Sequence, residues 1–411
     1  MKSIYILLIV LAFSFTSSAN YVEFPNKVQL AEIMASLPFT EGCIMADYES
    51  VHVPSQDKTY YEALFWDSKT GQSKLYFYSY DTKAFKAYGD NVQLPTAPLE
   101  SVNGKVMMDY TAVHVPSEDK TYYEALVWDT KSGKSKLYFY SYDTKAFKAY
   151  GENVQFPASP LDFEIKGDVM VNYTSVHVPS QDKTYYEALF WDTKTGQSAL
   201  YFYSYDTKGF KKYGDNVQFP AAPLDEVKGD VMVDYTSVHV PSEDKTYYEA
   251  LFWDTKTGKS KLYFYSYDSK TFKPYGENVQ LPAVPIDISY EGTVMADYAS
   301  VHVPSKDKTY YEVLFWDTKT GKSALYFYSY DSKAFKKYEE NVQFPASPLE
   351  GVKGEVMVNY TSVHVPSQDK TYYEALFWDS KTGKSKLYFY NYDSKSFKPY
   401  GENVQLTATP L

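Results

Sequence analysis

The chain has 411 residues, is 44% hydrophobic and 18% aromatic, and carries a net charge of −11. This composition predicts a folded chain rather than a disordered one. Every basic residue is lysine, so the chain lacks the bidentate guanidinium that grips phosphates, and together with the acidic balance this argues against nucleic acid or an anionic membrane as a partner.

The first nineteen residues have the layout of a secretory signal peptide. Lys2 precedes an apolar run from Ile4 to Phe15, and small residues follow up to Ala19. The pattern predicts residues 1–19 as a signal peptide cleaved after Ala19. An apolar run of about 12 residues is too short for a membrane span, which needs about 20. We therefore expect a secreted, extracellular chain without a membrane span.

One unit then returns six times. Residues 20–43 form an N-terminal segment, and the repeats occupy residues 44–105, 106–168, 169–230, 231–293, 294–355 and 356–411. The spacings between repeat starts are 62, 63, 62, 63 and 62 residues. A fixed period of this kind determines the architecture before any single residue is considered.

Each unit contains four short runs, illustrated by the third repeat. Val169–Val178 alternates and is rich in β-branched residues, Thr184–Asp192 follows a proline-containing turn, and Ala199–Asp206 alternates again. A fourth run ends in Asn216–Pro220. Gly196 in the turn after the second run is suited to the positive φ of a hairpin loop. Helical periodicity is absent, so four strands are predicted for each unit.

Strands with apolar or aromatic residues on both faces need cover on both sides. Six units stacked around an axis provide this cover, which predicts an all-β fold, a six-bladed β-propeller. A linear β-solenoid is the alternative, although solenoid repeats of this kind are usually shorter. The segment Trp191–Gly196, Trp-Asp-Thr-Lys-Thr-Gly, resembles the strand-end signature of WD-repeat propellers. The resemblance covers that hairpin alone and implies the fold, not the function.

The fourth run has one copy too many. Asn26–Leu30 resembles Asn91–Leu94, and the C-terminus has its own copy at Asn403–Leu406. We expect the additional copy to close the ring by pairing with the other terminus, or to remain an edge strand for a partner.

All six histidines occupy the same repeat position, at His52, His114, His177, His239, His302 and His364. No second histidine or cysteine lies within the unit, and the nearest strand carboxylate, Asp47, is replaced by Asn172 and Asn359 in two repeats. This variation argues against a metal site, and we expect neither a metal nor another cofactor. A packing role is predicted, with each imidazole bonded to a neighbouring blade or a backbone carbonyl.

The second run places tyrosine, glutamate and tryptophan on one strand face, as with Tyr60, Glu62 and Trp66. A sugar hydroxyl bonded to the glutamate, with the sugar ring stacked on Trp or Tyr, is the binding hypothesis. The alternatives are a core tryptophan and a cross-strand pair between the glutamate and Lys74, although alanine replaces that lysine in two units. The candidate ligand-binding residues are Tyr60, Glu62, Trp66, Tyr122, Glu124, Trp128, Tyr185, Glu187, Trp191, Tyr247, Glu249, Trp253, Tyr310, Glu312, Trp316, Tyr372, Glu374 and Trp378.

Two covalent features are also candidates. Asn172 and Asn359 begin N-glycosylation sequons, although both replace an aspartate of the repeat, and drift accounts for them more simply. Cys43 is the only cysteine, and polar residues occupy its aligned positions in the other repeats. We therefore predict an exposed Cys43 that can form an intermolecular disulfide.

Six equivalent units suit multivalent recognition, in which weak sites combine into avidity. The chain is similar to repeat-built propeller lectins in its predicted secretion, copy number and aromatic content. This resemblance implies carbohydrate binding at an equivalent site in each repeat, with glycans or glycoproteins as partners. A structural or adhesive extracellular protein that self-associates is the alternative, and an enzyme on a propeller scaffold is the third. No catalytic motif is present, so we predict that the protein is not an enzyme.

Overall fold

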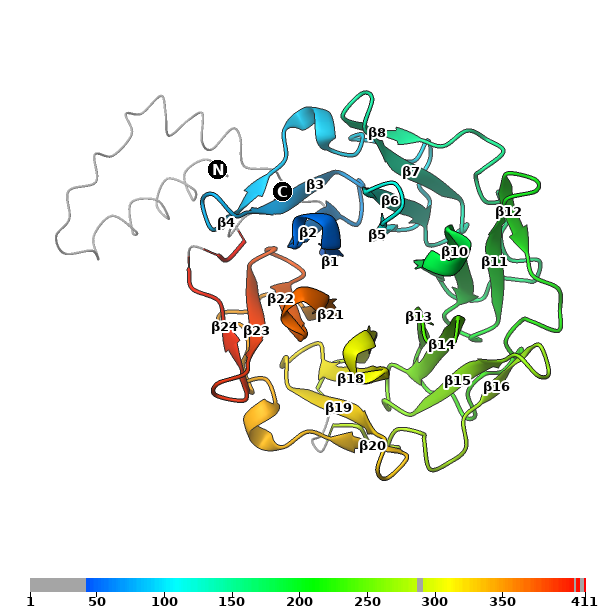
Figure 1. The fold of residues 1–411 in the computed structure, drawn as a ribbon. Coiled ribbons are helices and arrows are strands. Elements are labelled where there is room, and N and C mark those ends of the chain that lie inside the picture. Colours follow the sequence, from blue (N-terminus) through cyan, green and yellow to red (C-terminus); the bar gives the residue numbers. More distant parts are fainter. Residues whose placement is uncertain (1–41, 287–290, 403, 407–409) are drawn as a thin grey trace, which may run out of the picture. The chain divides into compact units, whose positions relative to one another are not determined.

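The computed structural model describes residues 42–286, 291–402, 404–406 and 410–411. These residues form six four-stranded antiparallel sheets arranged in a ring (Figure 1). The predicted six-bladed β-propeller is confirmed, and the linear solenoid is not observed. The predicted signal peptide and almost all of the N-terminal segment lie outside the described residues. Within the described residues, no helix is long and apolar enough to span a membrane.

Each blade is built from four consecutive strands. The innermost strands are β1 (Ile44–Val53), β5 (Val106–Val115), β9 (Val169–Val178), β13 (Val231–Val240), β17 (Val294–Val303) and β21 (Val356–Val365). The second strands are β2 (Lys58–Asp67), β6 (Lys120–Asp129), β10 (Lys183–Asp192), β14 (Lys245–Asp254), β18 (Lys308–Asp317) and β22 (Lys370–Asp379). All six repeat starts predicted from the sequence are therefore the first residues of inner strands.

The outer half of each blade is shorter. The third strands are β3 (Ser73–Ser79), β7 (Ser135–Ser141), β11 (Ser198–Ser204), β15 (Ser260–Ser266), β19 (Ser323–Ser329) and β23 (Ser385–Asn391). The fourth strands are β4 (Ala84–Ala87), β8 (Ala146–Ala149), β12 (Gly209–Lys212), β16 (Thr271–Pro274), β20 (Ala334–Lys337) and β24 (Ser396–Pro399). Short 3₁₀ helices are η1 (Pro54–Gln56), η2 (Asp90–Val92), η3 (Pro179–Gln181), η4 (Pro304–Lys306), η5 (Glu340–Val342) and η6 (Pro366–Gln368).

The predicted fourth run is wrong at its end, because Asn216 and Gln218 follow β12 and belong to no strand. The Gln218 side chain accepts a hydrogen bond from the Leu200 backbone N–H at 2.7 Å and donates to the Leu200 carbonyl at 3.3 Å. Asn216 donates to the carbonyl of Lys270 in the next blade at 3.3 Å. These amides take the place of backbone pairing at the blade edge, so Asn216 and Gln218 contribute side-chain bonds rather than a strand.

Blades are joined face to face through the second strand. The Trp191 indole N–H donates to the Val231 carbonyl of the next blade at 3.0 Å, and the Val231 N–H donates to the Thr193 carbonyl. Gly196 closes the adjoining hairpin with a φ of +71°, and a Cβ there would meet the Pro223 ring at 2.8 Å. Both the turn conformation and the approach of the next blade therefore require glycine at this position.

Among the described strands, no sheet combines strands from the two ends of the ring. The same contacts that join other blades join the last to the first: Trp378 donates to the Ile44 carbonyl at 3.0 Å, and the Tyr48 hydroxyl donates to Glu374 at 2.7 Å. Leu406, of the C-terminal copy, is buried in this interface. Leu406 therefore takes the place that its equivalents in the other repeats, such as Leu94 and Phe219, have at their interfaces. The N-terminal copy, residues 26–30, lies outside the described residues.

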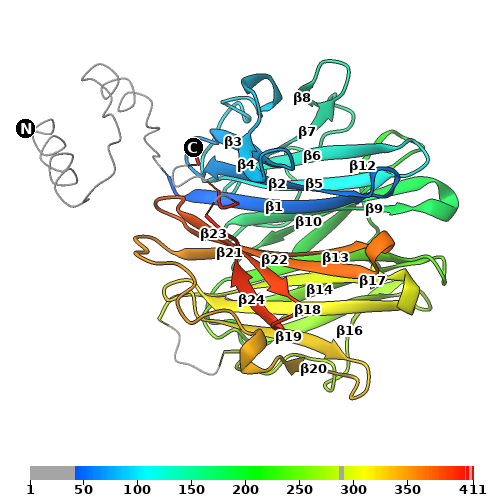
Figure 2. The ribbon, with the colours of Figure 1, turned by 60° about the vertical axis from the view of Figure 1, so that its left-hand side comes forward.

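A second circle of contacts connects the turns after the inner strands. The Ser55 hydroxyl donates to Asp119 of the next blade, and the equivalent pair occurs at all six interfaces, ending with Ser367 and Asp57. The aspartates take a left-handed conformation, with φ of 47° at Asp57 and Asp119. In the turned view of Figure 2, the inner strands run from one face of the ring to the other. These turns therefore lie at one face, and the entry to each inner strand lies at the opposite face.

Candidate functional site

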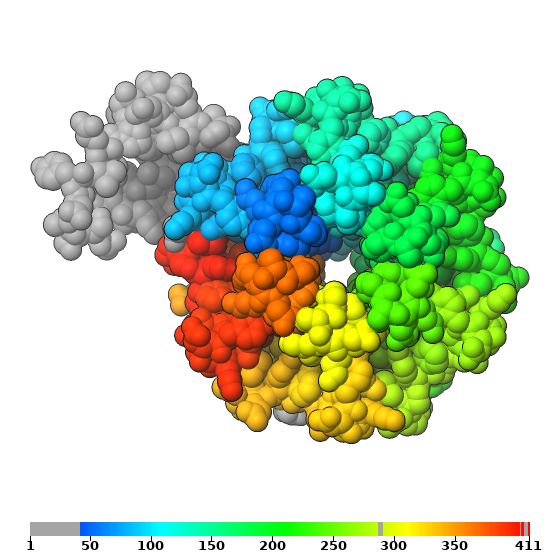
Figure 3. Space-filling model, in the orientation of Figure 1, coloured from blue at the N-terminus to red at the C-terminus, as the bar shows by residue number. Residues whose placement is uncertain are grey.

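The candidate site is a pocket between adjacent blades, and five such pockets have equivalent linings. Their cavity volumes lie between about 230 and 340 Å³. Each pocket takes residues from the second strand of one blade and from the inner and second strands of the next. The turns after the inner strands contribute Gln56 and Asp119 to the pocket between the first two blades, and these turns surround the centre of the face seen in Figure 3. The pockets therefore share one face of the ring.

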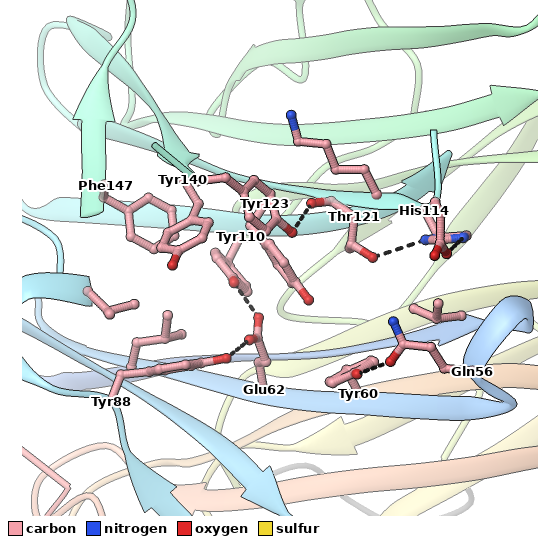
Figure 4. Close-up of a pocket in the computed structure, with 16 residues that line it drawn as sticks. Gln56, Tyr60, Glu62, Tyr88, Tyr110, His114, Thr121, Tyr123, Tyr140 and Phe147 are labelled. Carbon is pink, nitrogen blue, oxygen red and sulfur yellow. Dashed lines mark hydrogen bonds and ion pairs between the residues drawn. The ribbon is translucent and has the colours of Figure 1, made fainter. Parts of the chain in front are cut away.

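The pocket between the first two blades shows the arrangement (Figure 4). Tyrosine dominates its wall, and a single buried carboxylate, Glu62, lies between the two blades. Tyrosine provides a rigid apolar face with a polar end, which suits ligands that present both kinds of surface. The polar and aromatic residues that line this pocket are Gln56, Tyr60, Glu62, Tyr88, Tyr110, His114, Asp119, Lys120, Thr121, Tyr123, Tyr140, Tyr142 and Phe147.

Glu62 joins the two blades at the base of this pocket. Its side chain is 4% exposed, and its two oxygens accept hydrogen bonds from Tyr88 of its own blade and Tyr110 of the next. Burial raises the pKa of Glu62 to about 7, and the two tyrosine hydroxyls oppose that rise. A carboxylate offers about four lone-pair positions, so two remain for a ligand donor.

The other five glutamates have the same two kinds of tyrosine partner. The sets are Glu124 with Tyr150 and Tyr173, Glu187 with Tyr213 and Tyr235, Glu249 with Tyr275 and Tyr298, Glu312 with Tyr338 and Tyr360, and Glu374 with Tyr400 and Tyr48. The proposed pairing with lysine is wrong, because the strand register places Lys74 opposite Phe65 and Phe77 opposite Glu62. The glutamate is satisfied by tyrosine instead.

The mouth of the pocket carries exposed aromatic faces. Tyr142 is 43% exposed, and its hydroxyl donates to the Thr121 carbonyl at 2.7 Å. The Lys120 ammonium lies 5.1 Å from the Tyr142 ring and 4.7 Å from the ring of Tyr122, which belongs to the following pocket. Cation–π contacts of this geometry hold the lysine between two pockets. Tyr142 therefore has a fixed hydroxyl and an exposed ring at the entrance.

The structure brings the predicted tyrosines and glutamates together and separates the tryptophans from them. Trp66 is 2% exposed, and its indole N–H donates to the Val106 carbonyl of the next blade at 3.1 Å. All six tryptophans make the equivalent bond. None of the five pocket linings described above includes a tryptophan. The burial and the shared hydrogen bond make Trp66, Trp128, Trp191, Trp253, Trp316 and Trp378 packing residues.

Tyrosines of the third strand provide the aromatic wall in their place. Tyr140 and Tyr142 line the pocket together with Tyr123 of the second strand. The alternation of tyrosine along the third run was the only sequence signal for this wall. It does not show which neighbouring blade those rings face, which depends on how the blades stack.

The histidines have a structural role, but with a different partner from the predicted one. His114 Nδ1 lies 3.1 Å from the hydroxyl of Thr121, its cross-strand neighbour in the same blade. Desolvation lowers the pKa of His114, so the imidazole is largely neutral at pH 7. Each of the six histidines contacts the equivalent threonine of its own blade. Among the residues that the model covers, no group of three or more His, Cys, Asp or Glu side chains is arranged to hold a metal ion.

The two sequon asparagines lie on the inner strands, among the aspartates of the central ring. Asn172 donates to Asp109 at 3.4 Å and accepts from the Tyr235 backbone N–H at 3.3 Å. Asn359 donates to Asp47 at 3.3 Å. A glycan on either amide would break these bonds and would have to fit inside the ring, so the folded structure argues against glycosylation at both positions. Each side-chain amide instead donates a hydrogen bond to a neighbouring aspartate, which as a carboxylate can accept one but not donate one.

Cys43 is exposed, as predicted. Its backbone N–H donates to the Ser68 hydroxyl at 2.9 Å, and its carbonyl accepts from the Ser68 N–H at 2.9 Å. The main chain is therefore anchored to the first blade while the thiol faces solvent. The intermolecular disulfide stays a prediction.

No family model matches this chain, and no curated protein sequence matches it. Solved structures do resemble it. The Aleuria aurantia lectin in complex with Fucα1-6GlcNAc has a TM-score of 0.52 at 7% identity, over 87% of this chain and 94% of the lectin. A further structure of that fungal lectin, described as a six-bladed β-propeller with a fucose recognition mode, has the same TM-score, identity and coverage. A Hadza microbial sialidase is less similar, with a TM-score of 0.45 at 11% identity over 86% of this chain and 65% of the sialidase. The chain thus has the six-bladed β-propeller fold found in the Aleuria aurantia lectin.

Proposed function

We propose that this protein is a secreted, multivalent carbohydrate-binding protein that binds a sugar residue in each pocket between blades. The observation that carries the proposal is the repetition of one tyrosine-walled pocket around a buried glutamate, on a single face of the ring. Cavities of 230 to 340 Å³ are at the small end of ligand pockets, which suits one sugar ring rather than an extended chain.

The binding mode follows from the lining. A sugar ring has apolar C–H faces and hydroxyl edges, so it can stack on a tyrosine ring such as Tyr140 and donate a hydroxyl to Glu62. Hydrogen bonds to a charged acceptor are about twice as strong as neutral ones. Each site is still small and has an exposed tyrosine at its mouth, so we expect weak binding at one pocket. Sites on a common face combine through avidity, which raises apparent affinity by about 10² to 10⁴ when several engage one surface.

We propose binding without catalysis. Glycoside hydrolysis uses two carboxyl groups that flank the scissile bond. In the first pocket, Glu62 is buried against two tyrosines, while the other lining carboxylate, Asp119, is exposed and accepts the Ser55 hydroxyl that joins two blades. Incubation with labelled oligosaccharides, followed by product analysis, tests this part of the proposal, and released reducing sugar would contradict it.

A glycan array with the mature chain tests the binding itself. The decisive variant carries Glu→Gln at positions 62, 124, 187, 249, 312 and 374, which preserves the side-chain shape and removes the charge. We expect at least a tenfold loss of array signal with an unchanged β circular dichroism spectrum. Glu152→Gln, at an exposed position outside the pocket linings, is the matched control. A blank array for the unmodified chain, with visible self-assembly, would instead favour the structural or adhesive function.

A further inference from the structure

One position distinguishes pockets that are otherwise identical. Every residue in the lining of the first pocket has the same identity at the equivalent position of all six interfaces, with one exception. The exception is the residue directly before the aspartate of the turn that follows the inner strand. That residue is Gln56, Glu118, Gln181, Glu243, Lys306 or Gln368. We name these six residues the mouth position. Five of them line a described pocket.

The mouth position is held against the pocket wall rather than free in solvent. The Tyr60 hydroxyl donates to the Gln56 amide oxygen at 2.5 Å, as Figure 4 shows. The equivalent tyrosines Tyr185 and Tyr372 donate to Gln181 and Gln368. Tyr122 and Tyr247 donate to the carboxylates of Glu118 and Glu243. Lysine has no acceptor, so Lys306 cannot receive this bond. The side-chain charge is thereby fixed at the entrance in the two acidic pockets.

The charge of the mouth position differs between pockets, whereas the charged residues next to it in sequence are the same in every repeat. The neighbouring aspartate and lysine, as in Asp119 and Lys120, are present at all six interfaces. The pockets of Gln56, Gln181 and Gln368 therefore share one net charge. Those of Glu118 and Glu243 are one unit more negative, and that of Lys306 is one unit more positive.

We propose that the mouth position selects the charge of the bound sugar. On this proposal, the pockets of Glu118 and Glu243 bind a sugar with a protonated amino group, and the pockets with glutamine bind uncharged sugars. The Lys306 pocket binds a sugar with a carboxylate. The inference depends on the proposed carbohydrate binding and deepens it, because it divides equivalent sites into three specificities.

The size of the effect follows from the exposure of these side chains. A charge-assisted hydrogen bond is about twice as strong as a neutral one, whereas an exposed ion pair gains little in water. We expect about a fivefold preference of an acidic pocket for an amino sugar over its N-acetylated form. Added salt should weaken this preference, because exposed charges are screened over about 10 Å at 0.1 M ionic strength.

The chain provides its own matched controls. The variant Glu118→Gln/Glu243→Gln/Lys306→Gln gives every pocket the residue that three pockets already have. The variant Gln56→Glu/Gln181→Glu/Gln368→Glu raises the number of acidic pockets from two to five. Titration calorimetry with a glucosamine trimer and with its N-acetylated counterpart measures both stoichiometry and affinity.

We expect the unmodified chain to bind the glucosamine trimer more tightly at about two sites, the all-glutamine variant to lose this preference, and the five-acid variant to show it at about five sites. Equal preference in all three proteins would overturn the inference and leave the mouth position as neutral drift at an exposed residue. Absence of binding of either probe, and of every sugar on an array, would instead overturn the proposed function. The two failures are therefore distinguishable.

Discussion

Replacing Glu187 by glutamine should remove a specific part of the pH dependence of stability. Glu187 is buried between two blades and accepts the hydroxyls of Tyr213 and Tyr235. Burial raises its pKa from 4.5 to about 7, against the opposing effect of the two hydroxyls. The folded chain therefore holds a proton that the unfolded chain has lost over this pH range.

The sign and size follow from proton linkage. Because the folded-state pKa of Glu187 is the higher one, its contribution to stability is fully present below about pH 4.5 and is lost as the pH rises through about 7. One pKa unit corresponds to 1.36 kcal/mol, so the difference between 4.5 and about 7 amounts to about 3 kcal/mol. Within the window, the slope is about −1 kcal/mol per pH unit for this one residue.

Urea unfolding followed by tryptophan fluorescence, at several values between about pH 4.5 and about pH 8, measures the effect. The other five glutamates are in separate interfaces and should cancel in the difference between the unmodified chain and Glu187→Gln. We expect that difference to shift by about 3 kcal/mol across the window, in favour of the variant at high pH. The exposed Glu152→Gln variant should show no such shift. A difference that is constant with pH would refute the assignment of the raised pKa to burial of Glu187.

Three other predictions concern packing and assembly. Trp191→Phe should lower the free energy of unfolding by about 1 to 3 kcal/mol, because it removes the bond to the Val231 carbonyl and leaves a void between blades; an unchanged denaturation midpoint would argue against this role. Gly196→Ala should destabilise the chain more than Gly351→Ala, because both glycines have positive φ but only Gly196 has Pro223 and Val231 within 3 Å of a new Cβ; equal losses in thermal unfolding would contradict the clash. Cys43 should give a dimer on a non-reducing gel that Cys43→Ser abolishes, and monomer alone under oxidising conditions would contradict the exposed thiol as a crosslink.

The sequence by itself determined the ring. The period, the four runs of each unit and the apolar residues on both strand faces led to six blades, and the repeat starts coincide with the first residues of the inner strands. The shared strand face of tyrosine, glutamate and tryptophan was also visible, because alternation along a strand depends on local geometry alone. The exposed Cys43 followed from its polar counterparts in the other repeats.

Only the tertiary structure decided which neighbour each side chain meets. Trp66 and Tyr60 share a strand face, yet Trp66 is buried against Val106 of the next blade, whereas Tyr60 lines a pocket between the same two blades. The tyrosine partners of Glu62 lie 26 and 48 residues away, one of them in another blade. Asn216 and Gln218 belong to a run that the sequence predicts as a strand. In the structure their side-chain amides bond instead to Lys270 of the next blade and to the Leu200 backbone of the same blade. Such contacts depend on how rigid sheets stack, and strand periodicity contains no information about stacking.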